Sequence, residues 1–305
     1  MRARRWTQVA AVFAANPWFV YLSNRTIYQG KAKGLCFPGF NCYACPLAVF
    51  SCPIGALQHS MAIMSPKNRV LSAAGLGGTE SAGPHGGFSF APFLYVVGFM
   101  GLIGVIFGRL ACGWICPFGF LQDMLYKIPT PKLRLPAWAR FGKYGTLAIL
   151  AVLVPYLTGV HWFSRLCPAG ALEGAIPLKL LPLKTALPAT GWFYWLKIGI
   201  LVAFLVWMVI TKRPFCRTAC PLGATWSLLT PVSMYGMQVD KLKCTKCGDC
   251  RSSCPVDINV YENANSPECV RCLDCKRVCP EGAVTSGFKA AGSPDALPEE
   301  RGPKE

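Results

Sequence analysis

Charged residues are scarce in this chain of 305 residues, at 15% of the sequence, whereas soluble domains usually spend about a quarter of their residues on charge. Acidic residues are the rarest of them, because 14 Asp and Glu stand against 31 Lys and Arg, and 53% of the chain is hydrophobic. This combination excludes a disordered tail and a simple nucleic-acid-binding protein. The uncharged residues gather in long runs, so we expect a protein embedded in a membrane.

Histidine is also rare, with three residues in the whole chain. A b-type haem in a membrane would need axial histidines inside the spans. His59 and His85 fall in a predicted outer loop, and His161 falls near the outer end of a predicted span, so a haem is disfavoured. A transporter is disfavoured too, because no predicted span contains a carboxylate or a broken-helix ion site.

Four apolar stretches have the roughly 20 residues that a helix needs to cross a hydrocarbon core about 30 Å thick. They are Trp6 to Asn24, Phe88 to Gly108, Tyr144 to Ser164 and Thr190 to Thr211. A cleaved signal peptide is the alternative for the first stretch, but no small-x-small cleavage site follows it, so we expect a retained helix. The positive charges of the short loops predict a multi-pass protein of the bacterial inner membrane with both termini in the cytoplasm.

An internal repeat supports this arrangement. Arg109-x-x-Cys112-x3-Cys116-Pro-x-Gly follows the second stretch, and Arg213-x-x-Cys216-x3-Cys220-Pro-x-Gly follows the fourth. The preceding loops also match, because Cys52-Pro-Ile-Gly-Ala-Leu resembles Cys167-Pro-Ala-Gly-Ala-Leu. The predicted fold is therefore an α-helical polytopic membrane protein with four transmembrane helices and a two-fold internal repeat, followed by an α+β dicluster ferredoxin-like domain. The expected parts are residues 1–110, 111–232, 235–287 and a disordered tail over 288–305.

Eight cysteines near the C-terminus follow the spacing of a two-cluster bacterial ferredoxin, C-x2-C-x2-C-x3-C-P given twice. In such modules the cysteine before proline crosses to the other cluster. One [4Fe-4S] cluster is thus predicted to bind Cys244, Cys247, Cys250 and Cys279, and the second Cys269, Cys272, Cys275 and Cys254. Structural zinc is the alternative, but it does not explain two complete runs of this kind.

The repeated C-x3-C-P motifs would meet on the cytoplasmic side of the membrane. Their four cysteines, Cys112, Cys116, Cys216 and Cys220, are the right number for one more [4Fe-4S] cluster. Free buried thiols would explain one cysteine but not two copies at one spacing, and a tetrahedral zinc site stays open as an alternative.

Five further cysteines would gather on the opposite side. These are Cys36, Cys42, Cys45, Cys52 and Cys167. They suffice for one four-thiolate cluster with one to spare, whereas disulfides are the equal alternative in an oxidising compartment. The pair Cys42-x2-Cys45 favours a cluster, and the sequence does not indicate which cysteine is redundant.

Lys197 lies about two turns inside the fourth predicted span. The expected behaviour of its side chain is to reach the lipid headgroups. Contact with a quinol oxygen or a cluster is the alternative, and it makes Lys197 the candidate cofactor-binding residue.

Taken together, Cys112-Gly-Trp-Ile-Cys116-Pro-Phe-Gly, the second motif from Cys216 to Pro221, the four predicted spans and the C-terminal module resemble the NapH-type membrane ferredoxins. Those proteins are quinol-oxidising electron-transfer partners of periplasmic reductases and are related to the membrane part of the NosR proteins. The resemblance covers nearly the whole chain and implies electron transfer between the quinone pool and a redox partner. The outer cysteines exceed the pattern of that family, and no flavin-binding domain is present.

We therefore expect single-electron transfer between quinone and the redox subunits of a larger complex, with no residue acting as general acid or nucleophile. The rival is a metal-reducing or redox-sensing assembly factor for another complex. A core about 30 Å thick is wide for one electron-transfer step. An outer and an inner cluster would need a quinone or a partner's cofactor between them, or would have to lie deeper in the membrane.

Overall fold

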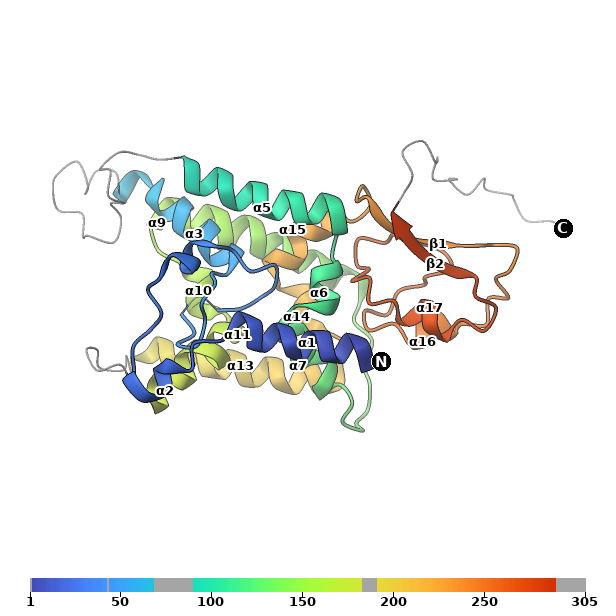
Figure 1. Cartoon of the computed structure of the whole chain (residues 1–305), viewed down its shortest axis with the longest axis horizontal. Helices are drawn as coiled ribbons and strands as arrows, with labels where there is room; N and C mark the ends of the chain where they lie inside the picture. Colours follow the sequence, from blue (N-terminus) through green and yellow to red (C-terminus); the bar gives the residue numbers. More distant parts are fainter. Residues whose placement is uncertain (1, 43, 69–89, 183–190, 289–305) are drawn as a thin grey trace.

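The structure, a computed structural model, describes residues 2–42, 44–68, 90–182 and 191–288. It consists of a bundle of helices with a small α+β module at one end of the bundle's long axis (Figure 1). The helix at the start of the chain runs along the bundle and begins at the end that faces the module.

The first half of the bundle contains α1 (Arg2–Ala15), α2 (Val20–Asn24), η1 (Lys31–Gly34), α3 (Pro53–Ile63), α5 (Ala91–Phe107), α6 (Leu110–Trp114) and α7 (Pro117–Leu125). The second half contains η2 (Ala137–Phe141), α8 (Gly142–Gly145), η3 (Thr146–Leu153), α9 (Val154–Thr158), α10 (Trp162–Leu166), α11 (Pro168–Gly170), η4 (Ala171–Ala175), α12 (Ile176–Leu180), α13 (Trp192–Ile210), α14 (Pro214–Thr218) and α15 (Pro221–Leu229).

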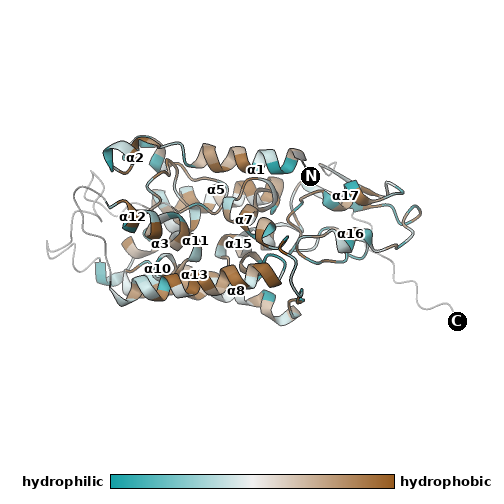
Figure 2. Cartoon of the chain, turned by 90° about the horizontal axis from the view of Figure 1, so that it is seen from below, coloured by the Kyte–Doolittle hydropathy of each residue, from teal (hydrophilic) through white to brown (hydrophobic). Residues whose placement is uncertain are grey.

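Two helices within the described residues are long and apolar enough to cross a membrane. They are Ala137–Thr158, which joins η2 through α9, and Trp192–Ile210, which is α13; α5 is apolar but shorter. The large apolar side chains of these two helices and of α5 are mostly exposed, as at Leu157 (58%), Val206 (57%) and Leu102 (61%). Much of the ribbon of the bundle has the colour of apolar residues (Figure 2), and many of these residues are exposed. Because such a surface is unfavourable in water, it is consistent with a location in lipid.

The predicted span from Trp6 to Asn24 is wrong as a single helix. α1 ends at Ala15, and the chain turns through Asn16 and Pro17 before α2. Proline cannot donate a helical hydrogen bond and disfavours helical geometry in the residue before it. The 14 residues of α1 extend about 21 Å, which is shorter than a hydrocarbon core.

The other predicted spans differ less from the structure. The third begins earlier and ends at Thr158, because Gly159 adopts a left-handed conformation (φ 69°) that closes the helix. The fourth agrees closely with α13, although Thr190 lies outside the described residues. The second corresponds to α5, and residues 88–89 lie outside the described residues.

The C-terminal module closes on a two-stranded antiparallel sheet. β1 (Tyr235–Val239) pairs with β2 (Val284–Phe288), with Tyr235 opposite Phe288 and Val239 opposite Val284. Two short helices, α16 (Asp249–Ser252) and α17 (Asp274–Val278), lie between the strands. The sheet thus joins the two ends of the cysteine-rich segment, as the predicted ferredoxin-like domain requires.

Candidate iron-sulfur centres

Four buried cysteines from the two repeats line one cavity. They come from α6, α14 and the residues before α7 and α15, and they are Cys112, Cys116, Cys216 and Cys220. The cavity is otherwise lined by Arg109, by apolar side chains and by glycines. The structure therefore brings together the four cysteines that the repeat predicted to share a site.

The local sequence fixes the second cysteine of each motif at the start of a helix. Cys116 and Cys220 are the N-cap residues of α7 and α15, and a proline follows each because the first helical position needs no amide hydrogen. The Gly119 N–H donates to Cys116 Sγ (3.4 Å), and the Gly223 N–H donates to Cys220 Sγ (3.2 Å). A helix N-terminus stabilises a thiolate, which is the form of cysteine that binds iron.

Two buried arginines tie the repeats together in a reciprocal way. Arg109 Nη2 donates to the carbonyl of Cys216 (3.1 Å), and Arg213 Nη1 donates to the carbonyl of Cys112 (3.0 Å). Both arginines are fully buried. Sequence reasoning included these arginines in the motif but gave them no role; their equal spacing from the first cysteine of each motif was the available signal.

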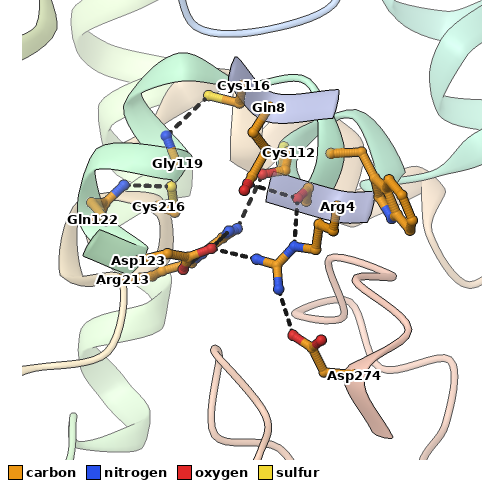
Figure 3. Close-up of polar contacts among 12 residues, drawn as sticks. Arg4, Gln8, Cys112, Cys116, Gly119, Gln122, Asp123, Arg213, Cys216 and Asp274 are labelled. Carbon is orange, nitrogen blue, oxygen red and sulfur yellow. Dashed lines mark hydrogen bonds and ion pairs between the residues drawn. The ribbon is translucent and has the colours of Figure 1, made fainter. Parts of the chain in front are cut away.

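The positive charge of Arg213 is balanced next to the cavity (Figure 3). Asp123 on α7 accepts from Arg213 Nε (2.6 Å) and also pairs with Arg4 of α1. Arg4 continues to Asp274 on α17 and donates to the carbonyl of Gly113 (3.0 Å). Burial alone would raise the pKa of Asp123, but Arg213 and Arg4 hold it below its usual range. One ionic network thus connects α1, α7, α14 and the module.

Arg109 is balanced by the module itself. Its Nη1 lies 3.0 Å from Glu268 Oε2, and the buried Lys143 pairs with the other carboxylate oxygen. Burial would raise the pKa of Glu268, but the two cations hold it below its usual range. Because Glu268 directly precedes Cys269, this ion pair positions a predicted cluster ligand against the membrane bundle.

The eight module cysteines line two further cavities. One is lined by Cys244, Cys247, Cys250 and Cys279, and the other by Cys254, Cys269, Cys272 and Cys275. These are the two sets that the ferredoxin spacing predicted. Four cysteines therefore line each of the three cavities.

The donor sets fit iron-sulfur clusters. Each cavity offers four thiols, and a [4Fe-4S] cluster binds four thiolates. Burial raises the pKa of the Cys112, Cys116 and Cys220 thiols, so these groups need a positively charged partner to bind as thiolates. Among the described residues, no three His, Cys, Asp or Glu side chains approach one another closely enough to hold a single metal ion.

The cavity between the repeats abuts the module through Gly113. A Cβ atom on Gly113 would lie 2.3 Å from the carbonyl oxygen of Val270 and 3.6 Å from the Cα atom of Cys272. Trp114 Nε1 donates to the carbonyl of Arg271 beside it (3.0 Å). The backbone of the first repeat motif is therefore packed directly against the ligand loop of the module.

We expect Gly113→Ala to lower thermal stability. The methyl group would collide with a backbone oxygen that cannot rotate away, and overpacking of this kind costs about 1–3 kcal/mol. The measurement is the unfolding temperature of the detergent-solubilised protein, followed by circular dichroism. Gly98→Ala on α5 is the matched control, because nothing lies within 4 Å of its Cβ position. Equal melting of the two variants would contradict the close packing.

Comparison with known proteins agrees with these sites. A family described as "4Fe-4S binding domain" (Fer4_5) matches residues 88–136 and 192–230, which contain all four inner cysteines. The ferredoxin-type protein NapH of Haemophilus influenzae is 28% identical over 50% of this chain and 49% of its own length. The methylamine utilization ferredoxin-type protein MauN of Methylorubrum extorquens is 27% identical over 49% of this chain and 48% of its own.

These matches support the resemblance to the NapH-type ferredoxins. An uncharacterized protein of Methanocaldococcus jannaschii, MJ0750, is also similar, at 29% identity over 55% of this chain and 67% of its own length. The matched region thus spans about half the length of NapH and MauN and two thirds of the archaeal relative. No solved structure matches significantly.

The structure also brings together several of the predicted outer cysteines, which lie outside the ranges matched by the family model. Cys42, Cys52 and Cys167 interact electrostatically with one another, and Cys45 shares a buried neighbour with them, Glu173. Cys36 has Tyr95 as its polar neighbour, and its segment pairs with Ser51, directly before Cys52.

Lys197 does not extend toward the lipid headgroups as expected. Its Nζ donates to the carbonyl of Ser164 (3.2 Å) and lies beside the outer cysteines, because this face of α13 packs against α10 and α11. Of the three histidines, His59 and His161 stack on each other with ring centroids 5.7 Å apart. His85 lies outside the described residues.

Proposed function

We propose that this protein moves single electrons between a membrane quinone and redox protein partners, through [4Fe-4S] clusters held by the inner cysteines and by the two cysteine sets of the module. The observation that carries the proposal is the contact at Gly113, which joins a cysteine set of the bundle to a cysteine set of the module. When bound, the clusters would supply one-electron carriers at these positions.

The order of the cysteine sets supports a continuous route. Two contacts join the inner set to the module's second set. They are the close approach of Gly113 to Val270 and the ion pair between Arg109 and Glu268. The module's two sets share ligand runs, because Cys254 belongs to the first run in sequence but lines the second cavity, while Cys279 does the reverse. Each set is therefore adjacent to the next, and electron-transfer steps between neighbours would be short.

Buried positive charge supports clusters at these places. A [4Fe-4S] cluster with four thiolates carries net negative charge, and Arg109, Arg213 and Arg271 are fully buried beside the two cavities that meet at Gly113. Arg271 donates to backbone carbonyls and to Ser233 Oγ, so its charge is available to a neighbouring anion. Arg109 and Arg213 are balanced by carboxylates, whereas Arg271 pairs, among the described residues, only with neutral groups, and an uncompensated buried cation of this kind favours an anionic occupant.

The test of function uses the full chain, purified anaerobically and placed in lipid vesicles. A short-chain quinol should reduce the clusters and bleach their visible absorption, with two electrons and two protons leaving each quinol as it becomes quinone. Selective reaction with copper or another metal ion, with no response to quinol or quinone, would favour the rival metal-reducing assembly factor instead. Clusters whose visible absorption changes with neither the quinol nor the metal ion would contradict both functions.

We also propose a multi-pass location in the bacterial inner membrane with both termini in the cytoplasm. The ion pair between Arg4 and Asp274 supports this, because it places the start of the chain beside the module. A reporter that is active only in the cytoplasm should therefore work when fused after Lys304 and be silent when inserted near Gly78. The reverse pattern would place the module, and its partner, on the outer side.

A further inference from the structure

We propose that Cys42, Cys45, Cys52 and Cys167 hold a fourth [4Fe-4S] cluster, deep in the bundle on the far side of the inner cavity from the module, and that Cys36 is not a ligand. This inference rests on the proposed function, because a cluster there extends the same electron route. It also identifies the redundant cysteine that the sequence left open.

The first observation is that Cys42 and Cys167 meet at two glycines. A methyl group on Gly170 would lie 3.4 Å from Cys42 Sγ, 3.7 Å from Cys167 Cβ and 3.2 Å from Lys197 Nζ. A methyl group on Gly174, one turn later, would lie 3.6 Å from the same Cys42 sulfur. The helix that follows Cys167 thus presents a surface without side chains toward Cys42, as a bulky group beside that sulfur would require.

The second observation is that the outer site repeats the geometry of the inner site. Cys52 and Cys167 are N-cap residues of α3 and α11, with proline next in sequence, as Cys116 and Cys220 are at α7 and α15. The Gly170 N–H donates to Cys167 Sγ (3.4 Å), as Gly119 and Gly223 do in the inner site. Each site therefore receives one helix N-terminus from each repeat.

The remaining two ligands have different origins in the two sites. The inner site adds Cys112 and Cys216, one from each repeat, whereas the outer site adds Cys42 and Cys45 from the first repeat alone. The Cys45 N–H donates to the carbonyl of Cys42 (3.0 Å), so the loop forms a turn that includes both cysteines. The insertion supplies the two ligands that the outer repeat motifs lack.

Two repeat-related polar residues hold this loop in place. Glu173 follows Cys167 by the same spacing as Gln58 follows Cys52. Glu173 Oε2 accepts from the Cys42 N–H (2.6 Å), and Gln58 Oε1 accepts from Ser164 Oγ (3.1 Å), shortly before Cys167. Each side chain therefore fixes the ligand segment of the other repeat, which is a positioning role for both residues.

The charges beside the site suit an anion. Lys197 Nζ lies next to Cys42 and Cys167, and Lys33, which donates to the carbonyl of Ala48 (3.0 Å), interacts with Cys45 and Cys42. Ammonium groups near thiolates stabilise them. The position of Lys197 is thus explained by the cysteines rather than by the membrane surface.

Cys36 differs from this group in its polar contact. Its backbone N–H donates to the Tyr95 hydroxyl (3.1 Å), its segment pairs with Ser51, and its thiol has Tyr95 as its polar neighbour. Its thiol is buried, and its polar contact is a phenol rather than a cation or a second cysteine. Cys36 therefore has the surroundings of a structural thiol.

A final observation links the outer and inner sites. The Phe40 N–H donates to Cys116 Sγ (3.4 Å), and Phe40 lines the inner cavity. Cys42 is two residues further on, so its Cα atom lies at most about 7 Å from that of Phe40. The loop therefore dips into the bundle, and the gap of about 30 Å between the membrane faces is not the distance between the two cysteine sets.

The test compares Cys42→Ser and Cys167→Ser with Cys36→Ser in the full chain, purified anaerobically. Iron and sulfide content, native mass and EPR spectra are measured for each. The wild type should hold about 16 iron atoms at four per cluster. Cys42→Ser and Cys167→Ser should each lose about four and the same EPR signal, while Cys36→Ser keeps all of them. Retained ferredoxin signals show that the variants fold.

Several results would overturn the proposal. These are unchanged iron in Cys42→Ser, loss of iron in Cys36→Ser, or a disulfide between outer cysteines found by peptide mapping of the unreduced wild type. If the variants do not assemble, the native mass of the wild type decides, because about 12 iron atoms would leave no room for the fourth cluster. About eight would contradict the inner cluster of the proposed function as well, so the two failures remain distinguishable.

Discussion

Cys116→Ser and Cys220→Ser are each expected to remove one and the same iron-sulfur centre, with a loss of about four iron atoms per chain. The reason is that Cys112, Cys116, Cys216 and Cys220 line a single cavity, to which each repeat contributes two thiols. Losing one of four thiolates undermines the whole site, so the effect should be close to complete. EPR of the reduced protein and iron analysis measure it.

The double variant makes this prediction sharper. Residues of one network are not additive, so Cys116→Ser combined with Cys220→Ser should lose no more iron than either single variant. The signals of the two module clusters serve as the internal control. Two different signals that respond separately to the two substitutions, or zinc recovered in place of iron, would contradict a shared cluster.

The cysteine sets were predictable from sequence because spacing encodes them. The two C-x2-C-x2-C-x3-C-P runs predicted which module cysteines group together, and Cys254 and Cys279 line the exchanged cavities as expected. The inner set followed from the repeat. In each case the cysteines lie on short segments whose local geometry, a tight turn or a proline-started helix, is set by neighbouring residues.

Features that depend on contacts between distant segments were not predictable. The hydrophobicity of Trp6 to Asn24 predicted one span, but α1 ends before Pro17. Arg4, at the start of α1, forms ion pairs with the distant residues Asp123 and Asp274. Lys197 was expected to reach the headgroups. Its contact with the carbonyl of Ser164, and its position beside the thiols of the first repeat, depend on segments distant in sequence. Cys36, the outer cysteine that we propose is not a ligand, could be singled out only from its contact with the distant residue Tyr95.

Glu268→Ala is expected to destabilise the junction between the bundle and the module more than any other single charge removal at the module's surface. Glu268 is the shared partner of Arg109 and Lys143, and both cations have fully buried side chains. Removing one partner of a buried ion pair leaves uncompensated charge and costs roughly 3–5 kcal/mol. At a few degrees per kcal/mol for a protein of this size, the unfolding temperature should fall by about 6 °C or more.

The matched control is Asp240→Ala, which also removes an acidic residue of the module. Its partner Lys243 lies 3.8 Å away, and the two side chains are 40% and 68% exposed, so the loss should be below about 1 kcal/mol. Thermal unfolding in detergent, with iron content measured alongside, separates a weakened junction from a lost cluster. If Glu268→Ala melts no earlier than Asp240→Ala while keeping its iron, the buried ion pair does not hold the module to the bundle. The close approach of Gly113 to Val270 would then have to maintain the contact between the two cysteine sets by itself.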